Sequence, residues 1–333
     1  ITPFKNGAVD YDAFAALVDR QVAGGIDFLV PLGTTGETPC LTDDEKIRVL
    51  QIAKQHSNGL PVMAGVGTNC LEQTIANIQL LEPHGVDYFL VVVPYYNKPP
   101  QEGMYQYYKA VAESTSKPII LYNVPGRTGC GIAPATAATR VKNVKNIVGI
   151  KEASGNISQV AKLMSLCGDE IELYSGNDDQ IVPLLSLGGK GVISVLSNVA
   201  PRQTHDIVAE YLAGNVEKSC QLQLDAIEVV EALFCEVNPI PVKETLNMFG
   251  KDFGPCRLPL GPMEENKKEL RAEKKAQKKA FKKARRRARR PWKFLTLLTG
   301  PFALIFTILF IVVSMFDNTM ALFLGGTFWE LEN

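Results

Sequence analysis

The sequence predicts an α/β protein whose main part is an eight-stranded (β/α)8 barrel of the TIM type. Short apolar runs and helix-like segments alternate along the first 200 residues, with a repeat of about 25–30 residues that is typical of βα units. Eight such units are the number that closes a barrel. The rival architecture is a doubly wound open sheet, but the chain has no Gly-rich dinucleotide turn after its first strand. These observations favour the barrel.

Eight apolar runs are predicted to be the strands. They are Ile1–Phe4, Phe28–Leu32, Val62–Gly65, Tyr88–Val93, Ile119–Tyr122, Ile147–Ile150, Ile171–Tyr174 and Gly191–Val195. Their β-branched and aromatic residues suit strands that are buried on both faces. The first run is only a stub, so we expect a truncated first strand and a more weakly closed barrel.

Segments with helical periodicity connect these runs. They are Tyr11–Ala23, Thr42–His56, Leu71–His84, Gln101–Thr115, Pro134–Val141 and Ser158–Leu166. After the barrel, which we assign to residues 1–200, residues 201–270 are predicted to form a C-terminal helical subdomain. Its clearest helix is Glu217–Ala232.

The charge of the chain is divided between its two parts. Of the 35 basic residues, 15 lie between Lys267 and Lys293, whereas only 5 of the 35 acidic residues follow residue 266. The first 266 residues therefore carry about 20 basic and 30 acidic side chains. An acidic body argues against nucleic-acid binding by the barrel.

The last part of the chain has the pattern of a membrane anchor. Residues 271–293 form a basic segment, residues 294–316 are apolar and carry no charge, and residues 317–333 form a short tail. A span of ~20 apolar residues crosses a bilayer, and the basic flank with Trp292 predicts a barrel on the cytoplasmic side. Two interpretations stay open: a genuine anchor that contacts the membrane, or a segment of a neighbouring gene joined by a sequencing or gene-calling error.

Cysteine and histidine usage narrows the chemistry further. The seven cysteines are scattered without a Cys-x-x-Cys pair, which favours a reduced, cytoplasmic setting. The three histidines, His56, His84 and His205, have no metal-ligand spacing. We therefore predict no metal site.

Lys151 ends the apolar run Ile147–Ile150, where a buried strand would stop. A lysine at such a position reaches solvent, pairs with an acid or serves as a reactive amine. Desolvation favours the neutral amine, which is a nucleophile. Active sites of barrels lie at the C-terminal ends of the strands, so we interpret Lys151 as an amine held beside a carbonyl substrate.

Other polar motifs follow the neighbouring runs, so they are predicted to lie at the same end of the barrel as Lys151. They are Gly33-Thr34-Thr35-Gly36-Glu37, Pro94-Tyr95-Tyr96-Asn97, Tyr122-Asn123-Val124-Pro125-Gly126-Arg127-Thr128-Gly129, Gly149-Ile150-Lys151-Glu152-Ala153 and Gly191-Val192-Ile193-Ser194-Val195. Through these motifs, residues 1–270 resemble the dihydrodipicolinate synthase family of class I pyruvate-dependent aldolases.

The resemblance implies a role for each matching residue. Lys151 would form a Schiff base with pyruvate, and Tyr122 would shuttle protons. A phenol is a poor base at neutral pH, so Tyr122 needs a relay, for which Thr34 and Tyr96 match the family's partners. In the family this second tyrosine comes from a neighbouring subunit, which implies at least a dimer and, by resemblance, a dimer of dimers.

The substrate-binding residues follow in the same way. Thr35 and Ile193 match positions that hold pyruvate, and Gly176 belongs to the same substrate-binding set. Arg127 matches the receptor for the carboxylate of aspartate semialdehyde, since a guanidinium binds carboxylates in a bidentate manner. Glu37 and Asp178 could equally be structural hydrogen-bond acceptors, so they are left out of the catalytic set.

The implied function is condensation of pyruvate with L-aspartate 4-semialdehyde, for the synthesis of diaminopimelate and lysine. The lysine amine supplies the electron sink, so no cofactor is expected. A related aldolase of the N-acetylneuraminate lyase or keto-sugar-acid type is one alternative. A non-catalytic, membrane-tethered barrel that acts as a scaffold is another.

The family's feedback site for lysine is altered in this chain. Asn69 and Tyr95 stand at their expected positions, but Lys46 replaces a histidine and Gln73 replaces the glutamate that holds the ligand's amine. A gained cation and a lost acid both disfavour a cationic ligand. We therefore expect weak or absent inhibition by lysine.

Overall fold

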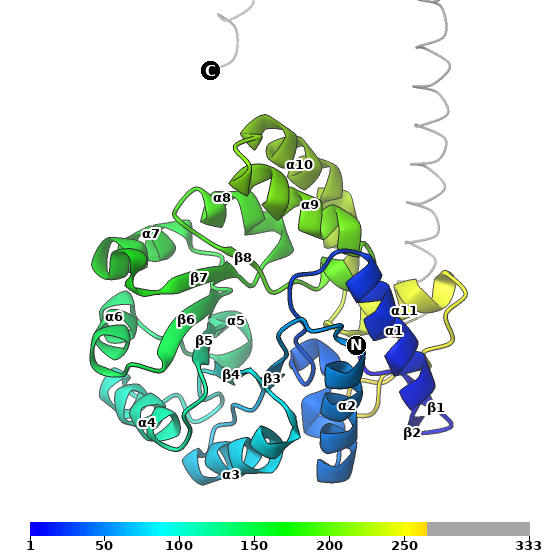
Figure 1. The fold of residues 1–333 in the computed structure, drawn as a ribbon, viewed down its shortest axis with the longest axis horizontal. Helices are drawn as coiled ribbons and strands as arrows, with labels where there is room; N and C mark the ends of the chain where they lie inside the picture. The colour runs from blue at the N-terminus through cyan, green and yellow to red at the C-terminus, as the bar shows by residue number, and fades with distance from the viewer. Residues whose placement is uncertain (265–333) are drawn as a thin grey trace, which may run out of the picture. The chain divides into compact units, whose positions relative to one another are not determined.

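The computed structural model describes residues 1–264, with only the backbone described for residues 140–142. These residues belong to one compact unit. Six parallel strands lie in chain order: β3 (Met63–Gly65), β4 (Tyr88–Val92), β5 (Ile119–Asn123), β6 (Ile147–Glu152), β7 (Glu172–Ser175) and β8 (Gly191–Val192). The sheet curls around a centre and the helices lie outside it, as in a TIM barrel (Figure 1). The predicted barrel architecture is confirmed.

The helices that cover the sheet alternate with its strands. They are α1 (Tyr11–Ala23), α2 (Asp43–His56), α3 (Leu71–Leu81), α4 (Gln101–Glu113), α6 (Pro134–Asn143), α7 (Ile157–Cys167) and α8 (Ile181–Leu185). Side chains cap several of them: Thr42 and Glu45 form a capping box at α2, and Asn156 accepts from Gln159 N at α7.

Short elements occupy several of the loops. They are the helix α5 (Pro125–Thr128) and the 3-10 turns η1 (Thr34–Gly36), η2 (Thr38–Cys40), η3 (Glu82–His84), η4 (Gly168–Glu170), η5 (Asp178–Gln180) and η6 (Leu196–Asn198). Three of them, η1, α5 and η5, follow directly on runs predicted to be barrel strands. They therefore lie where the sequence places the functional residues.

The first two predicted runs do not form regular strands of this sheet, which corrects the prediction of eight regular strands. Residues Phe4–Lys5 (β1) instead pair antiparallel with Ala8–Val9 (β2). The run at residues 28–32 lies parallel to β3: Leu29 forms a bridge with Val62, and Gly65 N donates to Pro31 O at 3.3 Å. It is not a regular strand because Pro31 has no N–H to donate and Leu32 has a φ of 60°.

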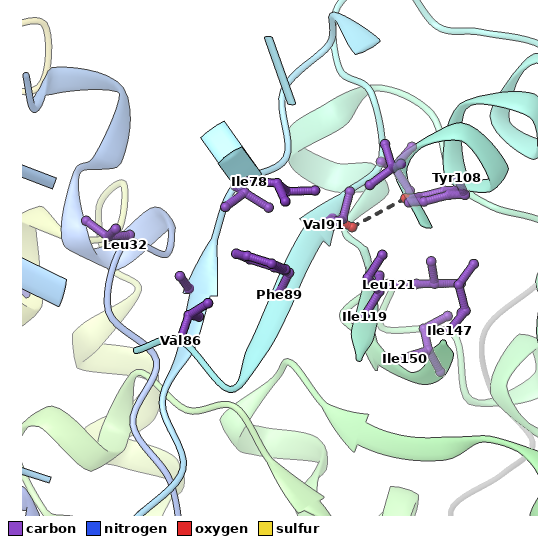
Figure 2. Close-up of a cluster of buried hydrophobic side chains, with 14 of the residues drawn as sticks. Leu32, Ile78, Val86, Phe89, Val91, Tyr108, Ile119, Leu121, Ile147 and Ile150 are labelled. Atoms are coloured by element: carbon purple, nitrogen blue, oxygen red, sulfur yellow. Dashed lines mark hydrogen bonds between the residues drawn. The ribbon is translucent and has the colours of Figure 1, made fainter. Parts of the chain in front are cut away.

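The hydrophobic core has an outer and an inner layer. Figure 2 shows the outer layer, in which Phe89, Ile119 and Leu121 from the sheet lie near Ile78 and Tyr108 from the helices. The inner layer lies on the other face of the strands and includes Leu90, Ile120, Tyr122 and Ile193. Each fully buried side chain of this size contributes about 1.5–3 kcal/mol. Alternation along the strands separates the two layers.

Three helices follow the barrel, as the sequence predicts: α9 (Pro201–Leu212), α10 (Val216–Leu233) and α11 (Ile240–Met248). They share a second apolar core with the barrel, in which Ile207, Val230 and Leu246 belong to the same cluster as Leu17 of α1. This core places the start of α11 beside the site described below.

Among the helices of residues 1–264, none is long and apolar enough to cross a membrane. The predicted basic segment 271–293, the predicted span 294–316 and the tail 317–333 lie outside the described residues. They remain predictions from the sequence.

Candidate active site

The register of the central strands brings Lys151 beside Tyr122. In the pairing of β5 with β6, Tyr122 lies opposite Lys151, and Lys151 in turn lies opposite Tyr174 of β7. Residues opposite each other on parallel strands point to the same face. The Lys151 Nζ accordingly lies 4.3 Å from the centroid of the Tyr122 ring.

Most of the predicted site residues line one cavity of about 1130 Å³. They are Thr34, Thr35, Tyr122, Arg127, Lys151, Gly176 and Ile193. They come from five segments that are far apart in the sequence. The fold therefore brings seven of the eight predicted site residues to the lining of one cavity.

Tyr96 is the predicted site residue that does not line this cavity. Its side chain is 87% exposed, whereas its neighbour Tyr95 does contribute to the lining. Tyr96 also has a φ of 71°, an uncommon conformation for a bulky residue. The prediction that a neighbouring subunit supplies this tyrosine stays a prediction.

Thr35 is held by a residue that the sequence did not single out. Its Oγ1 accepts a hydrogen bond of 2.9 Å from Asn238 Nδ2. Because that oxygen already accepts from Asn238, the single hydroxyl proton of Thr35 is available for a substrate carboxylate. Asn238 lies 203 residues away in the sequence, and no motif around it pointed to this contact.

Arg127 lies in the short helix α5, which begins at Pro125 directly after β5 and Val124. Its Nη2 donates a long hydrogen bond of 3.4 Å to Asn238 O. A guanidinium has five N–H groups, and within residues 1–264 this is the hydrogen bond that the Arg127 side chain forms. Donors are therefore left for a carboxylate.

Two buried carboxylates support the site. Glu152, next to Lys151, accepts from Asn123 Nδ2 at 2.9 Å and from Ser154 N at 2.7 Å. Asp178 accepts from Val195 N and Leu196 N, which draws the chain out of the sheet just after Ile193. Burial raises the pKa of both carboxyl groups, and the hydrogen bonds they accept oppose the shift. For Asp178 this geometry fits the structural role foreseen from the sequence.

Gly176 leaves room for the lysine side chain. A Cβ at this position would lie 3.0 Å from Lys151 Cε and 2.7 Å from Ala153 Cβ. The 2.7 Å contact is shorter than carbon atoms tolerate, and Ala153 Cβ is attached directly to the backbone. At 3.0 Å the Lys151 side chain, which is flexible, would have to shift. A larger residue would therefore displace the amine from Tyr122.

Comparison with known proteins agrees with this geometry. Residues 1–278 match the model of the dihydrodipicolinate synthetase family. The chain belongs to this family.

The alignments with individual relatives include nearly the whole length of each relative. The chain is 49% identical over 274 residues to the 4-hydroxy-tetrahydrodipicolinate synthase of Lachnoclostridium phytofermentans, covering 82% of this chain and 93% of that protein. It is 45% identical to the enzyme of the same name from Acetivibrio thermocellus, covering 81% and 92%. The crystal structure of dihydrodipicolinate synthase from Thermotoga maritima matches with a TM-score of 0.79 at 45% identity, covering 81% and 93%.

The crowding at Gly176 predicts a specific defect. In a Gly176→Ala variant the new methyl group displaces the Lys151 side chain, so we expect at least about tenfold slower borohydride trapping of a pyruvate adduct. Circular dichroism and the trapping rate are the two measurements. Gly103→Ala in α4, where a Cβ would meet its neighbours no closer than 3.4 Å, is the control. Wild-type trapping by Gly176→Ala would contradict the steric role.

Proposed function

We propose that this chain is a 4-hydroxy-tetrahydrodipicolinate synthase, a lyase that condenses pyruvate with L-aspartate 4-semialdehyde. The observation that carries the proposal is the position of Lys151 Nζ, 4.3 Å from the Tyr122 ring centroid, in a cavity that Thr35 and Arg127 also line. An amine, a phenol, a hydroxyl and a guanidinium are the groups that this reaction uses. The similarity of 45–49% to enzymes of this name supports the same assignment.

The first half of the reaction forms a carbon nucleophile. The Thr35 hydroxyl binds the pyruvate carboxylate, and Ile193 packs against the bound molecule. The Lys151 amine attacks the ketone carbon, and loss of water gives an imine. A proton then leaves the methyl group to give an enamine, because the protonated imine accepts the electron pair. Tyr122 carries protons in these steps, with Thr34 and Tyr96 as its relay.

The second half joins the two substrates. Arg127 binds the carboxylate of the semialdehyde, so that its aldehyde carbon meets the enamine carbon and the new C–C bond forms there. The amino group of the semialdehyde then displaces Lys151 from the imine carbon, which closes the ring and frees the enzyme. Lysine supplies the electron sink itself, so this route uses no metal or organic cofactor.

The site in this proposal is completed by a second copy of the chain. The 87% exposure of Tyr96 supports this, because an exposed phenol is free to enter a neighbour's cavity. We propose at least a dimer, and a dimer of dimers by resemblance. Contact of residues 294–316 with a membrane, and a cytoplasmic position of the barrel, remain part of the proposal on the sequence pattern alone.

Reduction with borohydride in the presence of pyruvate tests the Schiff base. We expect the protein to gain the mass of one pyruvic acid less one oxygen atom, with the modified peptide containing Lys151. Lys151→Ala should lose the adduct, whereas the exposed Lys162→Ala, on α7, should keep it. An unmodified wild-type protein would indicate a scaffold rather than an aldolase.

Arg127→Ala tests the choice of the second substrate. Loss of hydrogen bonds to a charged group costs about 1.5–3 kcal/mol, so we expect kcat/KM for aspartate semialdehyde to fall by about 10–100-fold. Pyruvate trapping should be unchanged, and Arg48→Ala on the exposed face of α2 serves as the control. Full activity of Arg127→Ala on this substrate would favour an aldolase that uses a sugar acid.

Lysine should inhibit this enzyme weakly or not at all. Lys46 and Gln73 line the same cavity as Tyr95. Lys46 donates to Asp43 at 2.9 Å, so part of its charge is neutralised. The replacement of the family's glutamate by Gln73 is therefore the stronger reason to expect weak lysine binding. A steady-state assay with added lysine is the measurement. Strong inhibition at sub-millimolar lysine would contradict this expectation.

A further inference from the structure

A buried ion pair connects the threonine turn to the C-terminal helices. Lys243 Nζ of α11 lies 2.8 Å from Glu37 Oε1, directly after the turn η1. Their side chains are 2% and 0% exposed. The two residues are 206 positions apart in the sequence, so the pair joins the two ends of the described chain.

Further contacts hold both partners of the pair. Glu37 Oε2 accepts from Arg257 N at 2.8 Å, and Lys243 Nζ also donates to Pro255 O at 3.2 Å. The ammonium group lies 4.0 Å from the centroid of the Phe4 ring, which is a cation–π distance. Lys243 does not line the cavity, and these contacts hold the Glu37 carboxylate, so neither residue is assigned a catalytic role.

The backbone at Glu37 needs this support. Its φ of 56° is left-handed, a conformation that residues with a Cβ hold only when their surroundings impose it. This residue ends η1, which contains Thr34 and Thr35. A change in its conformation would move both threonines relative to Lys151.

A second contact joins the same two segments. Asn238, five residues before Lys243, donates to Thr35 Oγ1, and its carbonyl accepts from Arg127. The segment from Asn238 to Lys243 thus holds the turn at two points and touches the arginine at a third. Fixing this segment fixes the groups proposed to bind both carboxylates.

We propose that Lys243 is a positioning residue, which acts through its buried pair with Glu37 to hold the Thr34–Thr35 turn in its place opposite Lys151. The proposal rests on the function proposed above. In it, Glu37, the last residue of the Gly-Thr-Thr-Gly-Glu motif, binds Lys243 and so holds the turn. Because Thr35 binds ground-state pyruvate, loss of the pair should first weaken pyruvate binding.

Three variants separate positioning from stability. Lys243→Met leaves the Glu37 charge buried without its partner, so we expect a lower melting temperature. We also expect the KM for pyruvate to rise by about tenfold, which corresponds to losing the hydrogen bond from Thr35 to the charged carboxylate. The double variant Glu37→Gln with Lys243→Met buries no charge. It should recover most of the melting temperature but keep the raised KM. Glu37→Asp keeps the charge and shortens the link by one methylene, which should also raise KM.

The control is the ion pair of Lys54 with Asp87, whose 2.7 Å contact lies between α2 and the start of β4. Lys54→Met should leave the KM for pyruvate unchanged. A folded double variant with the KM and kcat of the wild type would overturn the proposal, because the pair would then serve stability alone. If the double variant does not fold, a wild-type KM in Glu37→Asp overturns it instead.

Borohydride trapping of pyruvate by the wild-type protein distinguishes a failure of this proposal from a failure of the proposed function. If borohydride traps no pyruvate on Lys151 in the wild type, the enzyme assignment fails and the positioning role fails with it. If the wild type traps pyruvate and the variants bind it as tightly, the positioning role alone is overturned. A raised KM with a recovered melting temperature supports both.

Discussion

The alignment of β5 with β6 is the constraint on which the rest of this site depends. It sets Tyr122 opposite Lys151 and turns both side chains into the barrel. A slip of one residue would send one of them to the helix-covered face, where Leu121 and Ile150 now lie. The outer apolar layer therefore fixes the position of the amine, since shifting the strand would place the Lys151 side chain between Leu121 and Leu173, where Ile150 now lies.

Two of the buried acids near the site bind the backbone. Glu152 and Asp178 each accept from main-chain N–H groups close to the lysine or to Ile193. Such bonds repay part of the cost of burying a carboxylate. They also stop the strands at defined points, which is where a barrel presents its functional side chains. The cavity is thus shaped by how each strand ends.

The sequence predicted the local part of this structure well and the distant part poorly. Lys151 and Arg127 were found because each follows a recognisable strand, and strand order alone brings them to one face. The contacts of Asn238 with Thr35 and of Lys243 with Glu37 were missed because each joins residues more than 200 positions apart. Residues 1–4 were expected to be a truncated strand, and Phe4–Lys5 pair with Ala8–Val9 instead. The run at residues 28–32 lies beside β3 as expected, but Pro31 and Leu32 keep it from forming a regular strand.

The short strand β8 gives the barrel wall an uneven stiffness. It has two residues and, within residues 1–264, pairs with β7 alone, whereas β5 is bonded along both edges. Local opening requires the least free energy where the fewest backbone bonds break. Ile193 adjoins this seam, so we expect the side of the cavity that Ile193 lines to open more readily than the side that β5 forms.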